Sequence, residues 1–287
     1  MLVTLNHVMK IAEEKQIAIG SFNTPNLESL QAVIEAAEEL ELPVIIQFAQ
    51  CHEEWIPLSV IGPVMVETAR KATVPVCVHL DHGETLEYLQ QALDLGFTAI
   101  MYDGSALSYE GNLAGTMKAV EMAAKTGASV EAELGSMGRR VSKVGDNVSA
   151  DDRTKIYTDP DQAAVFVRET GIDALACSFG TTHGIYLTEP KLDFDIVKSV
   201  REKTEGIPVV MHGGSGVSRE DFVRSIEAGV RKVNYFTYMD KSGGNAVLEY
   251  LATQKEGDPV FFSSIVAAAK AAMKENVITA IRMFAGL

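Results

Sequence analysis

Short, almost continuously apolar runs alternate with amphipathic stretches along most of the chain. A strand that is buried on both faces of a parallel sheet carries such a run, because neither of its faces meets water. The pattern therefore predicts eight buried strands, at residues 17–22, 43–48, 75–80, 97–102, 128–134, 173–179, 207–212 and 230–236.

Between these runs, apolar residues recur at the spacing of one helix face. Examples are residues 26–40, 85–96 and 218–229, each of which finishes near a glycine or a polar residue. Eight alternating units of strand and helix predict an α/β fold, a (β/α)8 TIM barrel that occupies residues 1–287 as a single domain. A doubly wound parallel sheet is the alternative.

Two segments interrupt the alternation and are predicted to be loops. Residues 135–160 are polar and contain glycine, and they form either a lid over an active site or a disordered insertion. Residues 241–247 break the pattern after the eighth predicted strand.

Three of the six histidines stand at or just after the ends of apolar runs: His82, His183 and His212. A single histidine in such a place is most often structural. Three at equivalent strand ends favour a metal site instead, because the carboxyl ends of barrel strands meet at one rim. Zinc requires neutral imidazoles that converge on one point, with an open coordination position if the metal is catalytic.

Other polar residues are expected on the same rim. Asp81 and His82 follow the third predicted strand, Asp103 ends the fourth, and Asn234 lies near the end of the eighth. Glu131 and Glu133 lie on the fifth. Asp81 is adjacent to His82, so its carboxylate is positioned to move a proton beside the metal.

A glycine-rich turn, Gly213-Gly214-Ser215-Gly216, follows the seventh predicted strand. Glycines let backbone amides approach a ligand closely, and the N-terminus of the next helix favours an anion. Ser218 and Asp221 also fit a capping box, so ordinary helix initiation explains part of the segment. Its place after strand seven, where barrels often bind phosphate, favours a phosphate site.

Five motifs in this order resemble those of the class II, zinc-dependent ketose-bisphosphate aldolases, with fructose- and tagatose-bisphosphate aldolases most alike. They are VHLDHG (78–83), VEAELG (130–135), GTTHGIY (180–186), MHGGSG (211–216) and GVRKVN (229–234). The resemblance covers most of the chain, and the order, spacing and strand placement of the motifs all agree.

The resemblance implies a zinc ion held by His82, His183 and His212, with Asp81 as the catalytic acid and base. Glu133 matches a position that serves as an alternative metal ligand, and Asp103 is expected in the outer shell of the same site. For both acids the alternative is a supporting role behind the ligands or ordinary solvation at a strand end.

The resemblance also implies a site for the triose phosphate, with Asn234 acting in catalysis as well. Its residues are Gly184, Gly213, Gly214, Ser215, Asn234, Tyr235, Phe236 and Thr237. A monovalent cation, Na⁺ or K⁺, is a second candidate ion. The expected oligomer is a homodimer or a homotetramer.

The implied reaction is the reversible cleavage of a ketose phosphate to dihydroxyacetone phosphate and an aldehyde. Fructose or tagatose 1,6-bisphosphate, giving glyceraldehyde 3-phosphate, is the expected substrate. Another ketose phosphate, a non-catalytic sugar-phosphate sensor and a zinc phosphohydrolase are the alternatives. A mechanism that proceeds through a Schiff base with a lysine is disfavoured, because no lysine stands at the end of a predicted apolar strand.

Two departures from the family pattern bear on the substrate. The segment Asn234-Tyr235-Phe236-Thr237 is bulkier than usual and is expected to narrow the phosphate pocket. Gly138-Arg139-Arg140 stands where the family's loop often carries a glutamate; the nearest acids are Asp146, Asp151 and Asp152. Arg139 and Arg140 either bind the distal end of an anionic substrate or are solvated loop residues.

Three other histidines receive smaller roles or none. His79 shares its side of the strand with Asp81 and is either an orienting group or a buried core residue. His7 and His52 fall outside every motif and are assigned no role.

Composition narrows the partners and the compartment. The formal net charge of −14 argues against nucleic acid or an anionic membrane as a partner. No apolar run is long enough to span a bilayer, and the N-terminus lacks the pattern of a secretory signal. The three cysteines have no short-spaced pair, which indicates a reducing compartment, so we expect a cytoplasmic protein.

Overall fold

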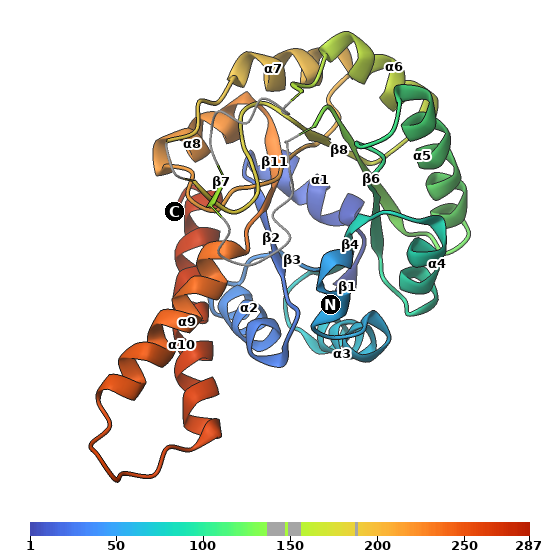
Figure 1. Ribbon diagram of the computed structural model, residues 1–287. Helices are drawn as coiled ribbons and strands as arrows, with labels where there is room; N and C mark the ends of the chain where they lie inside the picture. The colour runs from blue at the N-terminus through green and yellow to red at the C-terminus, as the bar shows by residue number, and fades with distance from the viewer. Residues whose placement is uncertain (137–146, 149–155, 187–188) are drawn as a thin grey trace.

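The computed structural model describes residues 1–136, 147–148, 156–186 and 189–287, with residues 147–148 described by their backbone only. Eight parallel strands form a ring, and β5 pairs with β4 to close it (Figure 1). In ring order the strands are β4 (Val76–Gly83), β3 (Val44–Ala49), β2 (Ile19–Asn23), β11 (Val230–Asn234), β10 (Val209–Met211), β8 (Ala174–Cys177), β6 (Ser129–Leu134) and β5 (Ala99–Tyr102). The predicted TIM barrel is confirmed, and the doubly wound sheet is wrong because the sheet has no open edge between β4 and β5.

Helices surround the ring and cover its outer face (Figure 1). They are α2 (Leu27–Leu40), α3 (Leu58–Lys71), α4 (Leu86–Asp94), α5 (Tyr109–Ala124), α6 (Pro160–Thr170), α7 (Phe194–Lys203), α8 (Arg219–Ala228) and α10 (Phe262–Phe284). The predicted helices at 26–40, 85–96 and 218–229 correspond to α2, α4 and α8. Each is capped by the residue before it, Asn26, Thr85 or Ser218, whose side-chain oxygen accepts from a backbone amide three residues later.

Inside the ring, successive layers of side chains change from apolar to polar. The amino-terminal layer is apolar, for example Ile19, Ile45 and Cys77, and it packs against the buried face of α1 (Leu5–Lys15). Two residues further along β2, β3 and β4 the side chains on the same face are polar, namely Ser21, Gln47 and His79, because residues i and i+2 of a strand share a face. Helix α1 therefore closes one end of the barrel, and the polar layers lead to the opposite rim.

Short elements complete the architecture. Strand β1 (Leu2–Val3) pairs with the first residues of β4, and η1 (Gln50–Glu54) follows β3. Strands β7 (Asn147–Val148) and β9 (Ile185–Tyr186) pair with each other. Among the described helices, none combines the length and the apolar character needed to cross a membrane.

The prediction of a loop at residues 241–247 is wrong. These residues lie inside α9 (Thr237–Ala252), which packs lengthwise on α10. A Cβ atom at Gly243 would lie 3.0 Å from Cγ of Met273, so this glycine is where the two helices approach closely. Together they form a hairpin that projects from the barrel (Figure 1, lower left). The other predicted loop, 135–160, falls mostly outside the described residues.

Candidate active site

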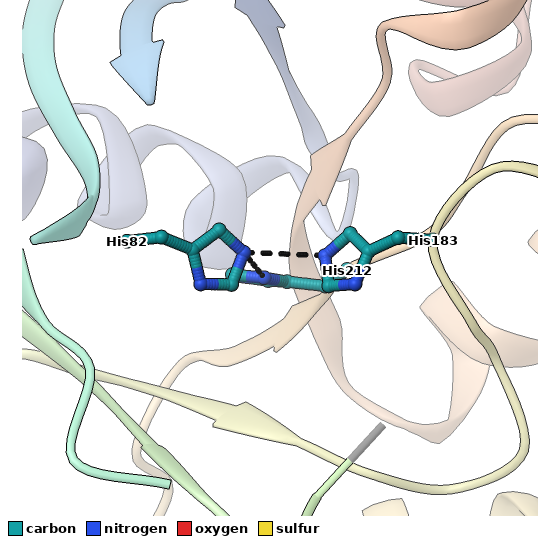
Figure 2. Close-up of side chains that lie close together, drawn as sticks. All are labelled: His82, His183 and His212. Carbon is teal, nitrogen blue, oxygen red and sulfur yellow. Dashed lines mark hydrogen bonds between the residues drawn. The ribbon is translucent and has the colours of Figure 1, made fainter. Parts of the chain in front are cut away.

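The three motif histidines meet at the carboxyl rim of the barrel. Nε2 of His82 lies 3.2 Å from Nε2 of His183 and 3.0 Å from Nδ1 of His212 (Figure 2). Two nitrogens bound to one tetrahedral zinc at about 2.0–2.1 Å would be about 3.4 Å apart, so these spacings are close to those of a ligand set. His82 and His212 are buried and His183 is half-buried.

Buried carboxylates set the direction in which two of these rings point. Nδ1 of His82 lies 2.5 Å from Oδ2 of Asp103, and Nε2 of His212 lies 2.8 Å from Oε1 of Glu131. An ionised carboxylate only accepts hydrogen bonds, so each of these ring nitrogens carries the hydrogen. The other nitrogen of each ring then presents a lone pair. Two such lone pairs face each other at 3.0 Å, an arrangement that a bound cation stabilises.

Burial keeps one of these rings neutral. Desolvation lowers the pKa of His212 to about 4; the hydrogen bond to Glu131 opposes the shift, and protonation of His82 would contribute to it. A neutral imidazole is the form that binds a metal.

An irregularity in β4 brings Asp81 and His82 to the same side. Adjacent strand residues normally point to opposite faces. Here the register between β4 and β5 shifts between Leu80 and Gly83, and His82 has φ 49°, in the left-handed region. A bulge of this kind re-aims a side chain, and such strained backbone tends to occur at functional sites. Both side chains therefore face the rim.

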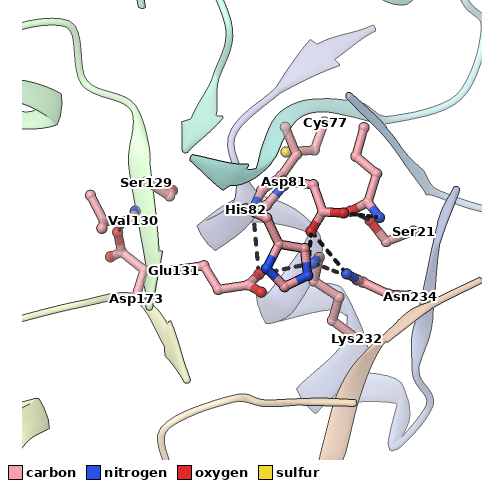
Figure 3. Close-up of polar contacts among 12 residues, drawn as sticks. Ser21, Cys77, Asp81, His82, Ser129, Val130, Glu131, Asp173, Lys232 and Asn234 are labelled. Carbon is pink, nitrogen blue, oxygen red and sulfur yellow. Dashed lines mark hydrogen bonds and ion pairs between the residues drawn. The ribbon is translucent and has the colours of Figure 1, made fainter. Parts of the chain in front are cut away.

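Three amide groups donate to the carboxylate of Asp81. Oδ1 accepts from Nδ2 of Asn234 at 3.1 Å, as Figure 3 shows, and Oδ2 accepts from Nδ2 of Asn23 and Nε2 of Gln47, each at 3.2 Å. Burial alone would raise the pKa of Asp81. In the acid range where Asp81 would take up a proton, protonated His82 and His212, followed by Lys232 and His79, outweigh burial and hold the pKa of Asp81 well below its ordinary value.

A buried ion pair lies beneath the histidines. Nζ of Lys232 is 2.9 Å from Oε2 of Glu131, and Nε2 of His79 is 3.4 Å from the same oxygen. All three side chains are fully buried. Burial would raise the pKa of Glu131, but the Lys232 ammonium, the hydrogen bond from His212 and the nearby His79 hold this pKa well below its ordinary value. His79 therefore contacts the polar layer as well as being buried.

Sequence reasoning missed several residues of this cluster. Gln47 is an isolated polar residue inside an apolar run, and Asn23 lies just after another. Lys232 lies two residues before Asn234 rather than at the end of its strand. The period of two would have found one of them, because Lys232 shares a face with Asn234. Gln47 shares a face with the apolar Ile45, so its position carried no such signal.

The remaining acids and arginines fall into two groups. Glu133, Asp103 and His82 form a second set whose ligand atoms lie within 4.8 Å of one another, so both acids adjoin the histidine cluster. Arg139 and Arg140, like Gly138, Asp146, Asp151 and Asp152, lie outside the described residues.

The predicted phosphate segments also adjoin one another. Ser215 Oγ accepts from the backbone amides of Phe236 at 3.3 Å and Tyr238 at 3.4 Å. The amide of Gly214 donates to the carbonyl of Asn234 at 3.0 Å. At Gly213, φ is 66° and a Cβ atom would lie 2.2 Å from the carbonyl oxygen of Thr182, so this position cannot carry a side chain.

These contacts join the loops that follow β8, β10 and β11, and Gly184 lies in the first of them. Thr237 begins α9, whose N-cap residue, Phe236, makes no side-chain capping hydrogen bond. Helix N-termini of this kind favour anions. Tyr235 is buried, and its ring centroid lies 6.0 Å from those of Phe22 and Phe284.

Phe236 packs against a residue to which the sequence assigned no role. Its ring centroid is 5.2 Å from that of His52, which in turn stacks on Trp55 at 4.7 Å. His52 is buried, and desolvation lowers its pKa to about 4 against the opposing charge of Asp81. His7, in contrast, is exposed on α1.

Comparisons with known proteins agree with this architecture. A family model described as "Fructose-bisphosphate aldolase class-II" matches residues 3–286. The chain is 39% identical to a probable fructose-bisphosphate aldolase of Bacillus subtilis, over 99% of this chain and 97% of that protein. It is 38% identical to the uncharacterized protein YdjI of Escherichia coli K12, over 99% and 98%. The crystal structure of the YdjI aldolase matches with a TM-score of 0.85 at 35% identity, over 99% and 97% of the two chains.

The buried, neutral His52 predicts a pH dependence of stability. Between about pH 6.5 and 4, His52 is protonated in the unfolded chain but stays neutral in the folded protein. The free energy of unfolding therefore falls as the pH is lowered through this window. One proton corresponds to a slope of about 1.4 kcal/mol per pH unit. Replacing His52 by Phe, which keeps the aromatic contacts, should reduce the slope measured by denaturant unfolding in the presence of a chelator. His7→Phe is the control, and equal slopes for wild type and His52→Phe would contradict the assignment.

Proposed function

Because this chain belongs to the class II fructose-bisphosphate aldolases, a family of aldehyde-lyases, we propose that it reversibly cleaves a ketose phosphate to dihydroxyacetone phosphate and an aldehyde. The proposed substrate is fructose or tagatose 1,6-bisphosphate, and the aldehyde is then glyceraldehyde 3-phosphate. The observation that carries the proposal is the convergence of three imidazoles beside a buried carboxylate held by three amides.

We propose that His82, His183 and His212 hold a zinc ion, since class II aldolases are in general zinc-dependent. The residues suit the ion: two lone pairs face one point, and the carboxylates of Asp103 and Glu131 support the rings from behind. Glu133 is the proposed alternative ligand. Zinc, when bound, supplies a Lewis acid that stabilises the negative charge of the enediolate.

Asp81 is the proposed catalytic acid and base. In the cleavage direction its carboxylate removes the proton of the C4 hydroxyl, the bond between C3 and C4 breaks, and the electron pair of that bond enters the enediolate. A proton taken up from solvent at C3 then converts the enediolate to dihydroxyacetone phosphate. In the condensation direction Asp81 returns the proton to the new hydroxyl. The low pKa of Asp81 keeps its carboxylate ionised at neutral pH, and Asn234, by donating to Oδ1, fixes the orientation of the carboxylate.

The proposed phosphate site consists of Gly184, Gly213, Gly214, Ser215 and the segment from Asn234 to Thr237, with Tyr235 acting as a buried support. Backbone amides and the start of α9 offer partial positive charge there, which matters in a chain of net charge −14. A monovalent cation, Na⁺ or K⁺, is also part of the proposal for this site.

The substrate assignment is tested by a panel of ketose mono- and bisphosphates, assayed for release of triose phosphate. Release of inorganic phosphate instead would identify a phosphohydrolase. Binding of sugar phosphates without turnover would identify a sensor. Arg139 and Arg140 are proposed to bind the distal end of an anionic substrate. The alternative is that both are solvated loop residues without a role in binding.

Removal of metal should abolish turnover. A chelator should reduce triose phosphate release to background, and zinc or cobalt should restore it, because the negative charge of the enediolate is otherwise unstabilised. His212→Ala should lose stoichiometric zinc, as measured by elemental analysis, whereas His7→Ala should retain it. Full activity in metal-free protein would contradict the proposal.

Replacement of Asp81 by Asn should separate binding from turnover. The amide cannot accept the C4 proton, so kcat should fall by at least about 100-fold. Zinc content and the dissociation constant for dihydroxyacetone phosphate should stay close to those of the wild type. Near-normal turnover in this variant would remove Asp81 from the mechanism.

We also propose that the protein is cytoplasmic and forms a homodimer or homotetramer. Cys51, Cys77 and Cys177 are all in the thiol form, which suits a reducing compartment. The tip of the α9–α10 hairpin exposes a group of large apolar side chains, which is characteristic of an association surface: Leu248, Leu251, Val260, Phe261 and Phe262.

The oligomer can be tested at the hairpin tip, where Phe262 is 78% exposed. Phe262→Asp should lower the mass measured by sedimentation velocity, because a charge opposes burial of the tip against a second copy. Met117→Asp, at a 48% exposed site on α5, is the control. A monomeric wild type, or an oligomer unaffected by Phe262→Asp, would contradict this surface.

A further inference from the structure

Lys232 is a fully buried lysine inside the barrel, and the proposed reaction does not use it directly. An ammonium in such a place is costly unless its hydrogens are bonded and its charge is balanced. Its two partners are Oε2 of Glu131 at 2.9 Å and Oδ1 of Asn234 at 2.7 Å (Figure 3). The first balances the charge, and the second connects Lys232 to the residue that touches Asp81.

The contact with Asn234 has a direction. An asparagine amide has an accepting end and a donating end, and an ammonium can only donate. Oδ1 of Asn234 must therefore face Lys232, which leaves Nδ2 to face Oδ1 of Asp81, at 3.1 Å. Lys232 fixes this orientation of the Asn234 amide whether or not Asp81 is protonated, because an ammonium can only donate.

We infer that Lys232 is a positioning residue, which acts through Asn234 to keep an N–H donor aimed at the carboxylate of Asp81. The inference deepens the proposed aldolase function and rests on it for its catalytic meaning. The alternative role is structural: Lys232 would serve only to neutralise Glu131, and Asn234 would keep its place without it.

The other side of Asp81 supplies a matched comparison. The Ser21 hydroxyl donates to Oε1 of Gln47 at 2.5 Å, and Nε2 of Gln47 contacts both Asn23 Oδ1, at 2.9 Å, and Asp81. This second relay begins at a neutral hydroxyl and does not include Asn234. Ser21→Ala therefore perturbs a relay to Asp81 without touching Lys232 or its partners.

A measurement on the Asn234 side-chain amide tests the inference without relying on turnover. In zinc-loaded protein, the NMR signal of this amide can be assigned by its loss in Asn234→Ala. A hydrogen bond to a charged donor restrains the amide, so Lys232→Met should raise the hydrogen-exchange rate of the Asn234 side chain by about 10–100-fold. Ser21→Ala should leave that rate unchanged. An unchanged rate in Lys232→Met would overturn the inference.

The double variant Lys232→Met/Glu131→Gln separates positioning from charge balance, and it protects the test if the single variant fails to fold. It removes both buried charges together, and the oxygen of the introduced amide still offers His212 an acceptor. If Lys232 serves only to neutralise Glu131, the exchange rate of the Asn234 amide should return to its wild-type value. Continued fast exchange supports positioning.

A double-mutant cycle then supplies the kinetic test. Lys232→Met should lower kcat by about 10–100-fold with little change in KM or zinc content, and in an Asn234→Ala background it should lower kcat by less than about threefold further. Multiplicative effects of the two substitutions would overturn the inference. Absence of aldolase turnover in the wild type would refute the proposed function, while the amide exchange would still decide the role of Lys232.

Discussion

The polar half of the barrel depends on keeping one buried carboxylate, Glu131, fully balanced. Glu131 accepts from His212 and pairs with Lys232, and it lies against His79, all without access to water. Removing one member of such a group leaves an uncompensated charge in the interior, which is strongly destabilising. The orientation of the His212 ring and the placement of Lys232 therefore follow from the same requirement. His212 in turn contacts His82, and Lys232 contacts Asn234, so both the histidine cluster and the amides around Asp81 depend on Glu131.

The two ends of the barrel interior serve different purposes. At the α1 end, apolar side chains such as Ile45 and Cys77 pack together and contribute to stability through burial. At the other end, most of the inward side chains described above are polar, and Asp81, Gln47 and His212 form hydrogen bonds with residues of other strands. Because the barrel is closed, its strands contribute to both layers, so the polar residues are placed by a packed core directly beneath them.

Much of the fold could be predicted from the sequence, because buried parallel strands leave a strong apolar signal and each predicted run overlaps an observed barrel strand. The motif histidines were found for the same reason, since they follow those runs. Asn23, Gln47 and Lys232 were not, because a single polar residue within or beside an apolar run hardly changes the pattern. The left-handed backbone of His82 has no sequence signal, as no glycine or asparagine occupies the position. Gly243 was misleading: it serves helix packing, and not a loop.

The bulge in β4 has a mechanical consequence. Asp81 and His82 are joined by one planar peptide unit and face the same rim, so a shift of the backbone at the bulge displaces the Cα atoms of both residues. A substitution that reshapes this part of β4 would thus change the placement of the proposed base and of a proposed metal ligand together.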